Sequence, residues 1–121
     1  MLSVKINKLD HSIGNKKILN NINLELEKDK IACILGPSGC GKTTLLKLIA
    51  GLFKVEKGEI LLDNELVSSN NIHLKTEKRK IGFLFQDYAL FPHQTVKENL
   101  QFAIRDKSSS HTIEEILDVI K

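Results

Sequence analysis

The stretch ILGPSGCGKTT at residues 34–44 decides the fold, because its residues follow the spacing G-x-x-x-x-G-K-[ST]. A loop of successive backbone N–H groups that opens into the amino terminus of a helix makes a cradle for anions. Gly36, Gly39 and Gly41 permit the backbone to curl close to a pyrophosphate without a clashing side chain. The pattern therefore predicts a loop that holds the phosphates of a nucleoside triphosphate.

The side chains of this loop have distinct expected roles. Lys42 is expected to reach the β- and γ-phosphates, and the Thr43 hydroxyl to complete a Mg²⁺ shell made mostly of water and phosphate oxygens. A plain strand-to-helix turn is the alternative, and the flanking pattern disfavours it. The pattern leaves the reaction open. The predicted nucleotide-binding residues of the loop are Gly36, Pro37, Ser38, Gly39, Cys40, Gly41, Lys42, Thr43 and Thr44.

The segments on either side supply the context that the loop needs. Residues 31–35, IACIL, form a short apolar run that predicts a strand buried on both faces, with Cys33 as a core residue. After the loop, leucines recur at helical spacing until Gly51, which is a plausible left-handed cap. The expected order is strand, phosphate loop, helix.

Patterns elsewhere predict further strands and helices. Alternating apolar residues on both sides of the turn at Gly14 predict an antiparallel pair, and KGEILLDNE at residues 57–65 predicts a strand that ends in a turn. Residues 68–80 are expected to form a surface loop, and residues 80–86 another buried strand. Capping boxes at Thr95 with Glu98 and at Thr112 with Glu115 predict two helices. The positive cluster of the loop is expected to be solvated: Lys75, Lys78, Arg79 and Lys80.

Composition narrows the function classes. The chain has 121 residues, 41% hydrophobic and 27% charged, with a net charge of +3, which suits one small globular domain. Its lysines are scattered, so no nucleic acid is expected as a partner. No apolar run is long enough to span a membrane. Two cysteines, Cys33 and Cys40, match neither a metal pair nor a disulfide framework and indicate a reducing cytosol. The four histidines lack metal-binding spacing and are expected at the surface.

The stretch IGFLFQDYALFPHQTVKENL at residues 81–100 carries a family resemblance. Together with the phosphate loop it resembles the ATP-binding-cassette family, in particular the nucleotide-binding subunits of bacterial importers, from the first strand to about Ala103. The resemblance implies that Gln86 closes a core strand and serves as a sensor whose amide ligates Mg²⁺ or orients a water. It also implies that residues 87–92, from Asp87 to Pro92, contact a membrane permease.

The same resemblance implies the architecture and the site. The fold class is α/β, an incomplete P-loop NTPase core with an antiparallel β hairpin at residues 1–30, the core at 31–86, and the start of a helical subdomain at 87–121. Lys42 and Gln86 would be catalytic, with ATP and Mg²⁺ as cofactors. Ile13 stands where the family has an adenine-stacking aromatic, so an aliphatic contact is expected there. Tyr88, Leu90 and Phe91 are apolar candidates for the permease contact, with packing in the core as the alternative for Leu90 and Phe91.

Several family motifs are not found in this sequence: the signature, the strand that ends in an aspartate and a catalytic glutamate, and the switch histidine. The acids within ILLDNE at residues 60–65 and within EILDVI at residues 115–120 only resemble these motifs, because Asp63 has turn chemistry and Asp118 lies on a predicted helix face. We therefore expect a piece of a longer protein that binds nucleotide, hardly turns it over, and self-associates through exposed edges.

The leading hypothesis for the intact protein is a transporter ATPase at the inner face of the cell membrane, held there by its permease. Two alternatives stay open. One is a soluble cassette ATPase that acts on nucleic acid or ribosomes, and the other is a non-catalytic nucleotide-binding module.

Overall fold

The structure is a computed structural model that describes residues 1–103 and 110–119 and divides into two compact units, Met1–Phe83 and Leu84–Lys121. The first unit contains β1 (Leu2–Ile13), β2 (Lys16–Glu27), α1 (Lys42–Ala50), β3 (Lys57–Leu62), β4 (Glu65–Ser68) and the short 3₁₀ helix η1 (Thr76–Lys78). The second contains α2 (Val96–Ala103) and α3 (Ser110–Val119).

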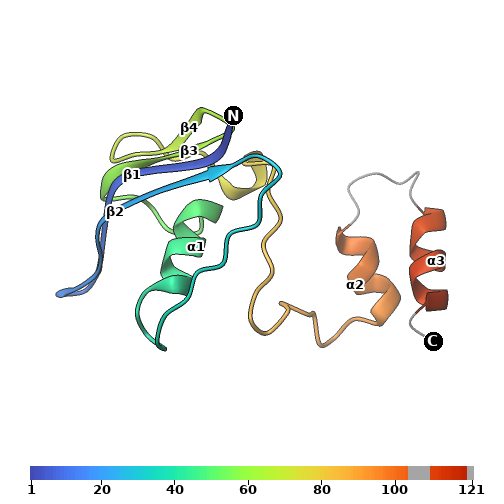
Figure 1. The fold of residues 1–121 in the computed structure, drawn as a ribbon. Coiled ribbons are helices and arrows are strands. Elements are labelled where there is room, and N and C mark those ends of the chain that lie inside the picture. The colour runs from blue at the N-terminus through green and yellow to red at the C-terminus, as the bar shows by residue number, and fades with distance from the viewer. Residues whose placement is uncertain (104–109, 120–121) are drawn as a thin grey trace. The chain divides into compact units, whose positions relative to one another are not determined.

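The first unit is built on a four-stranded sheet in the order β2-β1-β3-β4 (Figure 1). All three pairings are antiparallel, and β1 lies between β2 and β3, so that Ile6 is opposite Leu24 on one side and Ile60 on the other. The predicted opening pair and the strand after residue 57 are confirmed. Asp63 and Asn64 both have positive φ, 48° and 65°, which suits the two-residue turn that leads into β4.

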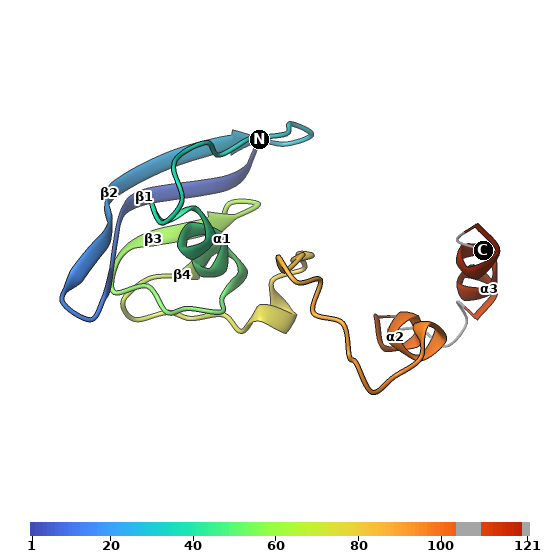
Figure 2. The same ribbon diagram turned by 90° about the horizontal axis from the view of Figure 1, so that it is seen from below.

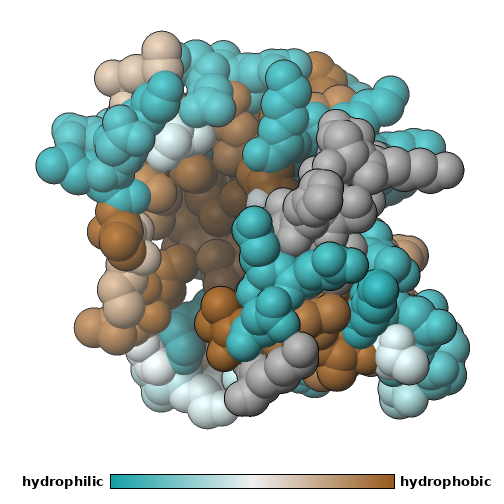
Figure 3. Space-filling model, turned by 90° about the vertical axis from the view of Figure 1, so that its right-hand side faces the viewer, coloured by the Kyte–Doolittle hydropathy of each residue, from teal (hydrophilic) through white to brown (hydrophobic). Residues whose placement is uncertain are grey.

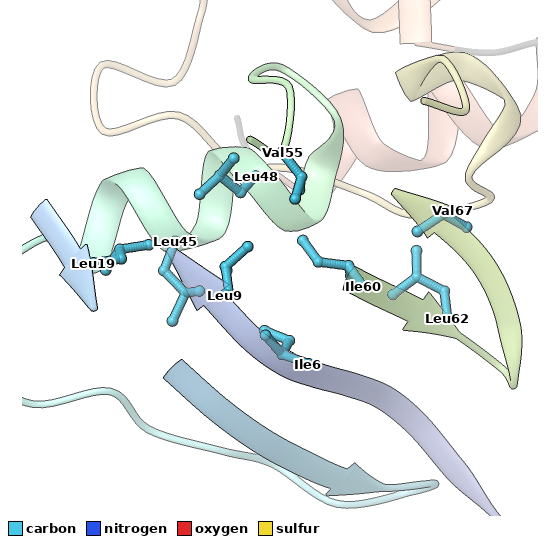
Figure 4. Packing of buried hydrophobic residues seen from close by; sticks show 9 residues of the cluster. All are labelled: Ile6, Leu9, Leu19, Leu45, Leu48, Val55, Ile60, Leu62 and Val67. Carbon is cyan, nitrogen blue, oxygen red and sulfur yellow. The ribbon is translucent and has the colours of Figure 1, made fainter. Parts of the chain in front are cut away.

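Helix α1 covers one face of this sheet, as the two ribbon views show together (Figures 1 and 2). Leu45 and Leu48 lie one turn apart on its inner side, and Leu48 is completely buried. Burying such a side chain stabilises a fold by about 1.5–3 kcal/mol. The core cluster between helix and sheet (Figure 4) consists of Ile6, Leu9, Leu19, Leu45, Leu48, Val55, Ile60, Leu62 and Val67.

The end of α1 agrees with the predicted cap. Gly51 has a φ of 82° in the left-handed region, and its N–H donates to the Leu48 carbonyl at 3.1 Å. A left-handed residue at this place costs little only if it is glycine. The helix therefore stops where the sequence predicts.

The two predicted buried strands at residues 31–35 and 80–86 are absent, so this part of the prediction is wrong. Ile31 and Leu35 are 100% and 85% exposed, and Cys33 is exposed instead of lying in the core. Within the described ranges neither segment pairs with a strand. Apolar sequence alone does not make a strand, because its backbone N–H and C=O groups need a neighbouring strand to bond.

Apolar side chains consequently remain on the surface. Figure 3 shows brown, apolar residues open on the face that it displays, among teal polar ones. Leu84 is 76% exposed, and Ile81 and Phe85 are each 37% exposed. Exposed apolar segments of this kind favour association.

In the second unit, α2 begins with the predicted capping box. Thr95 N donates to Glu98 Oε2 at 2.7 Å, and Glu98 N donates to Thr95 Oγ1 at 3.2 Å. Helix α3 starts at Ser110, before the predicted cap residue Thr112. The side chain of Thr112 lies outside the part of the chain that the structure describes. Asp118 lies exposed on α3, as expected for a helix-face acid.

Candidate phosphate-binding site

The phosphate loop, defined here as residues 36–44, runs into the amino terminus of α1. Gly41 is the N-cap residue, and the first intrahelical bond runs from Leu45 N to Gly41 O at 2.9 Å. The amides of residues 41–44 therefore have no acceptor inside the helix. The first turn of α1, which the structure describes in full, has no acidic residue. The positive end of the helix dipole is thus available to an anion.

Two of the glycines lie where an added Cβ would make close contacts. Gly41 has a φ of 104°, and a Cβ there would lie 2.9 Å from Ile18 Cγ2 and 3.0 Å from Leu19 Cδ2 on β2. A Cβ on Gly36 would lie 2.7 Å from the sulfur of Cys40. The absence of side chains therefore lets the loop lie directly against β2 and close on itself.

The Lys42 ammonium lies over the loop. Its Nζ donates to the carbonyls of Gly36 at 2.6 Å and Pro37 at 2.8 Å, and it is 3.6 Å from Cys40 Sγ. The loop is closed by a bond from Cys40 N to Pro37 O at 3.3 Å. Residues 36–40 are exposed and Lys42 is half-buried. The Lys42 ammonium, the amino terminus of α1 and the free amides of residues 41–44 thus lie together at one solvent-accessible place.

The remaining predicted site residues are spread over both units. Thr43 is exposed and Thr44 half-buried in the first turn of α1. Ile13 lies at the tip of the β1–β2 hairpin, opposite Lys16, and is 54% exposed. Gln86 belongs to the second unit, where it begins a turn at residues 86–89 instead of ending a strand. Within the first unit, residues 36–44 form one continuous loop and helix start.

The surface predicted to meet a permease lies in the second unit. Tyr88 and Leu90 are 66% and 67% exposed, whereas Phe91 is half-buried and packs edge-to-face on Phe102 at 4.8 Å between ring centroids. Leu90 is therefore open, and Phe91 is partly a packing residue. Asn99 of α2 fastens this segment, because its Oδ1 accepts from Phe91 N at 2.9 Å and its Nδ2 donates to Thr95 O at 2.9 Å.

A groove of about 420 Å³ lies beside these residues. Within the described residues, the buried Oε1 of Gln94 in its wall has no hydrogen-bond partner. Such an acceptor is costly unless a donor reaches it. The groove is lined by Leu90, Phe91, Pro92, Gln94, Val96, Asn99 and Leu100.

Arg79 contradicts the prediction of a solvated cluster, because it is 4% exposed. Burial lowers the pKa of its guanidinium. One feature of the sequence points to this burial: residue 79 is an arginine among lysines. A planar guanidinium suits buried hydrogen bonding better than an ammonium. It donates to five acceptors: the carbonyls of Leu48, Ile49, Val67 and Leu74 and the hydroxyl of Ser68.

Two histidines also depart from the expected surface placement. His11 is 8% exposed and stacks on Phe53, with ring centroids 5.7 Å apart and planes 7° apart. His73 is half-buried, and its pKa is lowered by burial first and by the nearby charges of Arg79 and Lys54 second. The buried Nδ1 atoms of both rings lack a hydrogen-bond partner among the described residues.

Within residues 1–103 and 110–119, no group of three or more histidine, cysteine or acidic side chains is arranged to hold a metal ion. No helix in these ranges has the length and apolarity to cross a bilayer.

A family model described as ABC transporter matches residues 19–121 of the chain. Among curated proteins, the chain is 42% identical over 120 residues to the spermidine/putrescine import ATP-binding protein PotA of Legionella pneumophila, covering 98% of the chain and 32% of the relative. It is 45% identical over 103 residues to the sulfate/thiosulfate import ATP-binding protein CysA of Neisseria meningitidis, covering 85% of the chain and 28% of the relative. The chain thus spans about a third or less of these relatives.

Among solved structures, a dimeric ATP-binding cassette in a post-hydrolysis state, bound to ADP and Pi, matches with a TM-score of 0.73. The sequences are 34% identical, and the match covers 93% of this chain and 53% of that one. The match supports an incomplete P-loop NTPase fold of the α/β class.

Proposed function

Because the chain belongs to the ABC transporter family, we propose that it is the ATP-binding part of an importer's nucleotide-binding subunit, and that the intact protein couples ATP hydrolysis to solute transport. The observation that carries this proposal is the phosphate loop. Its free amides, the start of α1 and the Lys42 ammonium converge on one exposed place. This donor set suits a triphosphate.

Each residue of the site would have its own role in binding MgATP. The amides at the start of α1 bind phosphate oxygens, and the Lys42 ammonium exchanges its two carbonyl partners for phosphate oxygens, which carry more charge. The Thr43 hydroxyl and the Gln86 amide oxygen are the ligands offered to Mg²⁺, and Ile13 offers an apolar contact to adenine. Bound MgATP supplies a transferable phosphoryl group with its charge partly neutralised by the metal.

We propose that residues 87–92 and the groove beside them dock on the permease. The open side chains of Tyr88 and Leu90 and the unpartnered acceptor of Gln94 support this role. Through this contact the protein would lie at the cytoplasmic face of the cell membrane. The matching cassette is dimeric in its solved structure, which supports a face-to-face dimer of the intact protein.

We propose that this part of the chain does not select the transported solute. The two relatives above are named for the import of polyamines and of sulfate or thiosulfate, which are cations and anions, yet they are similarly close at 42% and 45% identity. We therefore assign no solute.

Equilibrium dialysis with labelled ATP and Mg²⁺ tests nucleotide binding. We expect saturable binding that unlabelled ATP competes away. Failure of the folded chain to retain ATP would overturn the proposal.

Co-purification of the intact protein with a co-expressed permease tests the docking role. Leu90→Asp is expected to reduce co-purification and leave ATP binding unchanged. Val119→Asp, at an 85% exposed site on α3, is the matched control. Equal recovery of both variants would contradict the role of this surface.

A further inference from the structure

Arg79 is a buried cation whose acceptors are all neutral. Within residues 1–103 and 110–119 the ion pairs join Lys5, Lys17 and Lys57 to carboxylates, and none includes Arg79. Burying a charge without a counter-charge costs several kcal/mol unless hydrogen bonds compensate. The five acceptors around its guanidinium supply that compensation.

These acceptors come from three parts of the first unit. Nη1 donates to Leu48 O at 3.3 Å and Ile49 O at 3.0 Å, which are last-turn carbonyls of α1 and carry the negative end of its dipole. Nη2 donates to the Ser68 hydroxyl at 2.7 Å on β4. Nε donates to Leu74 O at 2.7 Å in the loop before η1. The planar fork of one side chain thus joins helix, sheet and loop.

Both ends of α1 are consequently fixed. Its amino end, at Gly41, touches β2, and its carboxyl end is held by Arg79. The nine residues of α1 join the Arg79 contacts at its carboxyl end to the phosphate loop at its amino end. Along the chain, Gln86 follows Arg79 by seven residues, since 86 − 79 = 7.

We propose that Arg79 is a positioning residue that sets α1 on the sheet and links the nucleotide state of the phosphate loop to the segment that leads to Gln86. This inference rests on the proposed function. Arg79 acts through α1, not by touching nucleotide.

Tyr88 gives a direct readout, because it is the single tyrosine of a chain without tryptophan and lies two residues after Gln86. In the wild-type chain, saturating MgATP is expected to change Tyr88 emission, and Lys42→Ala is expected to abolish the change. N-acetyltyrosinamide with the same nucleotide corrects for absorption by adenine.

Arg79→Lys keeps the charge but replaces the planar five-donor fork with three donors on one atom. We expect its Kd for MgATP to rise, by at most about tenfold, which is the effect that losing one hydrogen bond to a charged group would have if it were passed on in full to binding. The Tyr88 response at saturation is expected to disappear. Lys78→Arg, at the exposed neighbouring position, is the matched control and should behave as wild type.

If circular dichroism shows that Arg79→Lys folds poorly, two further measurements test the inference. Ser68→Ala removes a single acceptor and is expected to weaken MgATP binding in the same direction but less. In Arg79→Ala, guanidinium chloride far below unfolding concentrations is expected to restore binding and the Tyr88 response, whereas equal sodium chloride is not.

The outcomes separate this inference from the proposed function. A wild-type chain that shows no Lys42-dependent ATP binding overturns the proposed function and the inference with it. Binding without any Tyr88 response overturns the link to the Gln86 segment. Wild-type affinity and response in both Arg79→Lys and Ser68→Ala overturn the positioning role and leave ATP binding standing.

Discussion

The Arg79 guanidinium lies against the backbone of Gly51, so closely that a Cβ on residue 51 would be 2.6 Å from the guanidinium carbon. This contact joins the last turn of α1 to a residue 28 positions further along the chain, since 79 − 51 = 28. Gly51 therefore has two roles. It is the left-handed cap of the helix, and its lack of a side chain leaves room for the Arg79 guanidinium.

Gly51→Ala is expected to lower the free energy of unfolding by about 2–5 kcal/mol, from left-handed strain plus overpacking. Gly14→Ala is the matched control, because Gly14 also has positive φ, 58°, but a Cβ there meets nothing within 4 Å. Gly14→Ala should lower the free energy of unfolding only by the cost of left-handed backbone strain, about 1–2 kcal/mol. Equal losses in urea unfolding of the two variants would show that the Arg79 contact contributes nothing.

Lys42→Ala is expected to remove most of the affinity for MgATP, because the ammonium and the free amides act on the same phosphates. Binding should weaken by at least about tenfold, as for loss of a charged hydrogen bond. Lys30→Ala, at an exposed position before the loop, is the control. Calorimetric titration with ATP and Mg²⁺ measures both, and equal affinities would refute the role of Lys42.

Alkylation of Cys40 with N-ethylmaleimide is expected to block nucleotide binding, because its sulfur is 3.6 Å from Lys42 Nζ inside the loop. Cys33 is also free and exposed, so it provides the comparison. A Cys40→Ala chain alkylated at Cys33 should still bind ATP, whereas a Cys33→Ala chain alkylated at Cys40 should not. Full modification of Cys40, verified by mass, with unchanged ATP affinity would reject this prediction.

The lowered pKa of His73 predicts a pH dependence of stability. Burial is the main cause, so the folded state favours the neutral ring more than the unfolded state does, whose pKa is near 6.5. The stabilising contribution is present above pH 6.5 and is lost as the pH falls through the folded pKa. We expect thermal stability to decline below pH 6.5 and the decline to be shallower in His73→Gln. Identical pH profiles for the two proteins would contradict this assignment.

Negligible ATPase activity is expected of the 121-residue chain, because its sequence lacks an acidic strand end and a signature loop to complete the site. Phosphate release measured with Lys42→Ala as the blank checks this. Steady release by the wild-type chain, absent from the variant, would prove the expectation wrong.

Local spacing and turn chemistry determined much of this protein from sequence alone. The start of α1 after Gly41, the cap at Gly51, the turn at Asp63 and the capping box at Thr95 depend on contacts within a few residues, so the sequence predicts them correctly. The burial of Arg79 and the lack of strands at residues 31–35 and 80–86 were decided only by the tertiary structure. Hydrogen-bond partners for these groups must come from distant parts of the chain, and a local pattern contains no information about which distant group arrives.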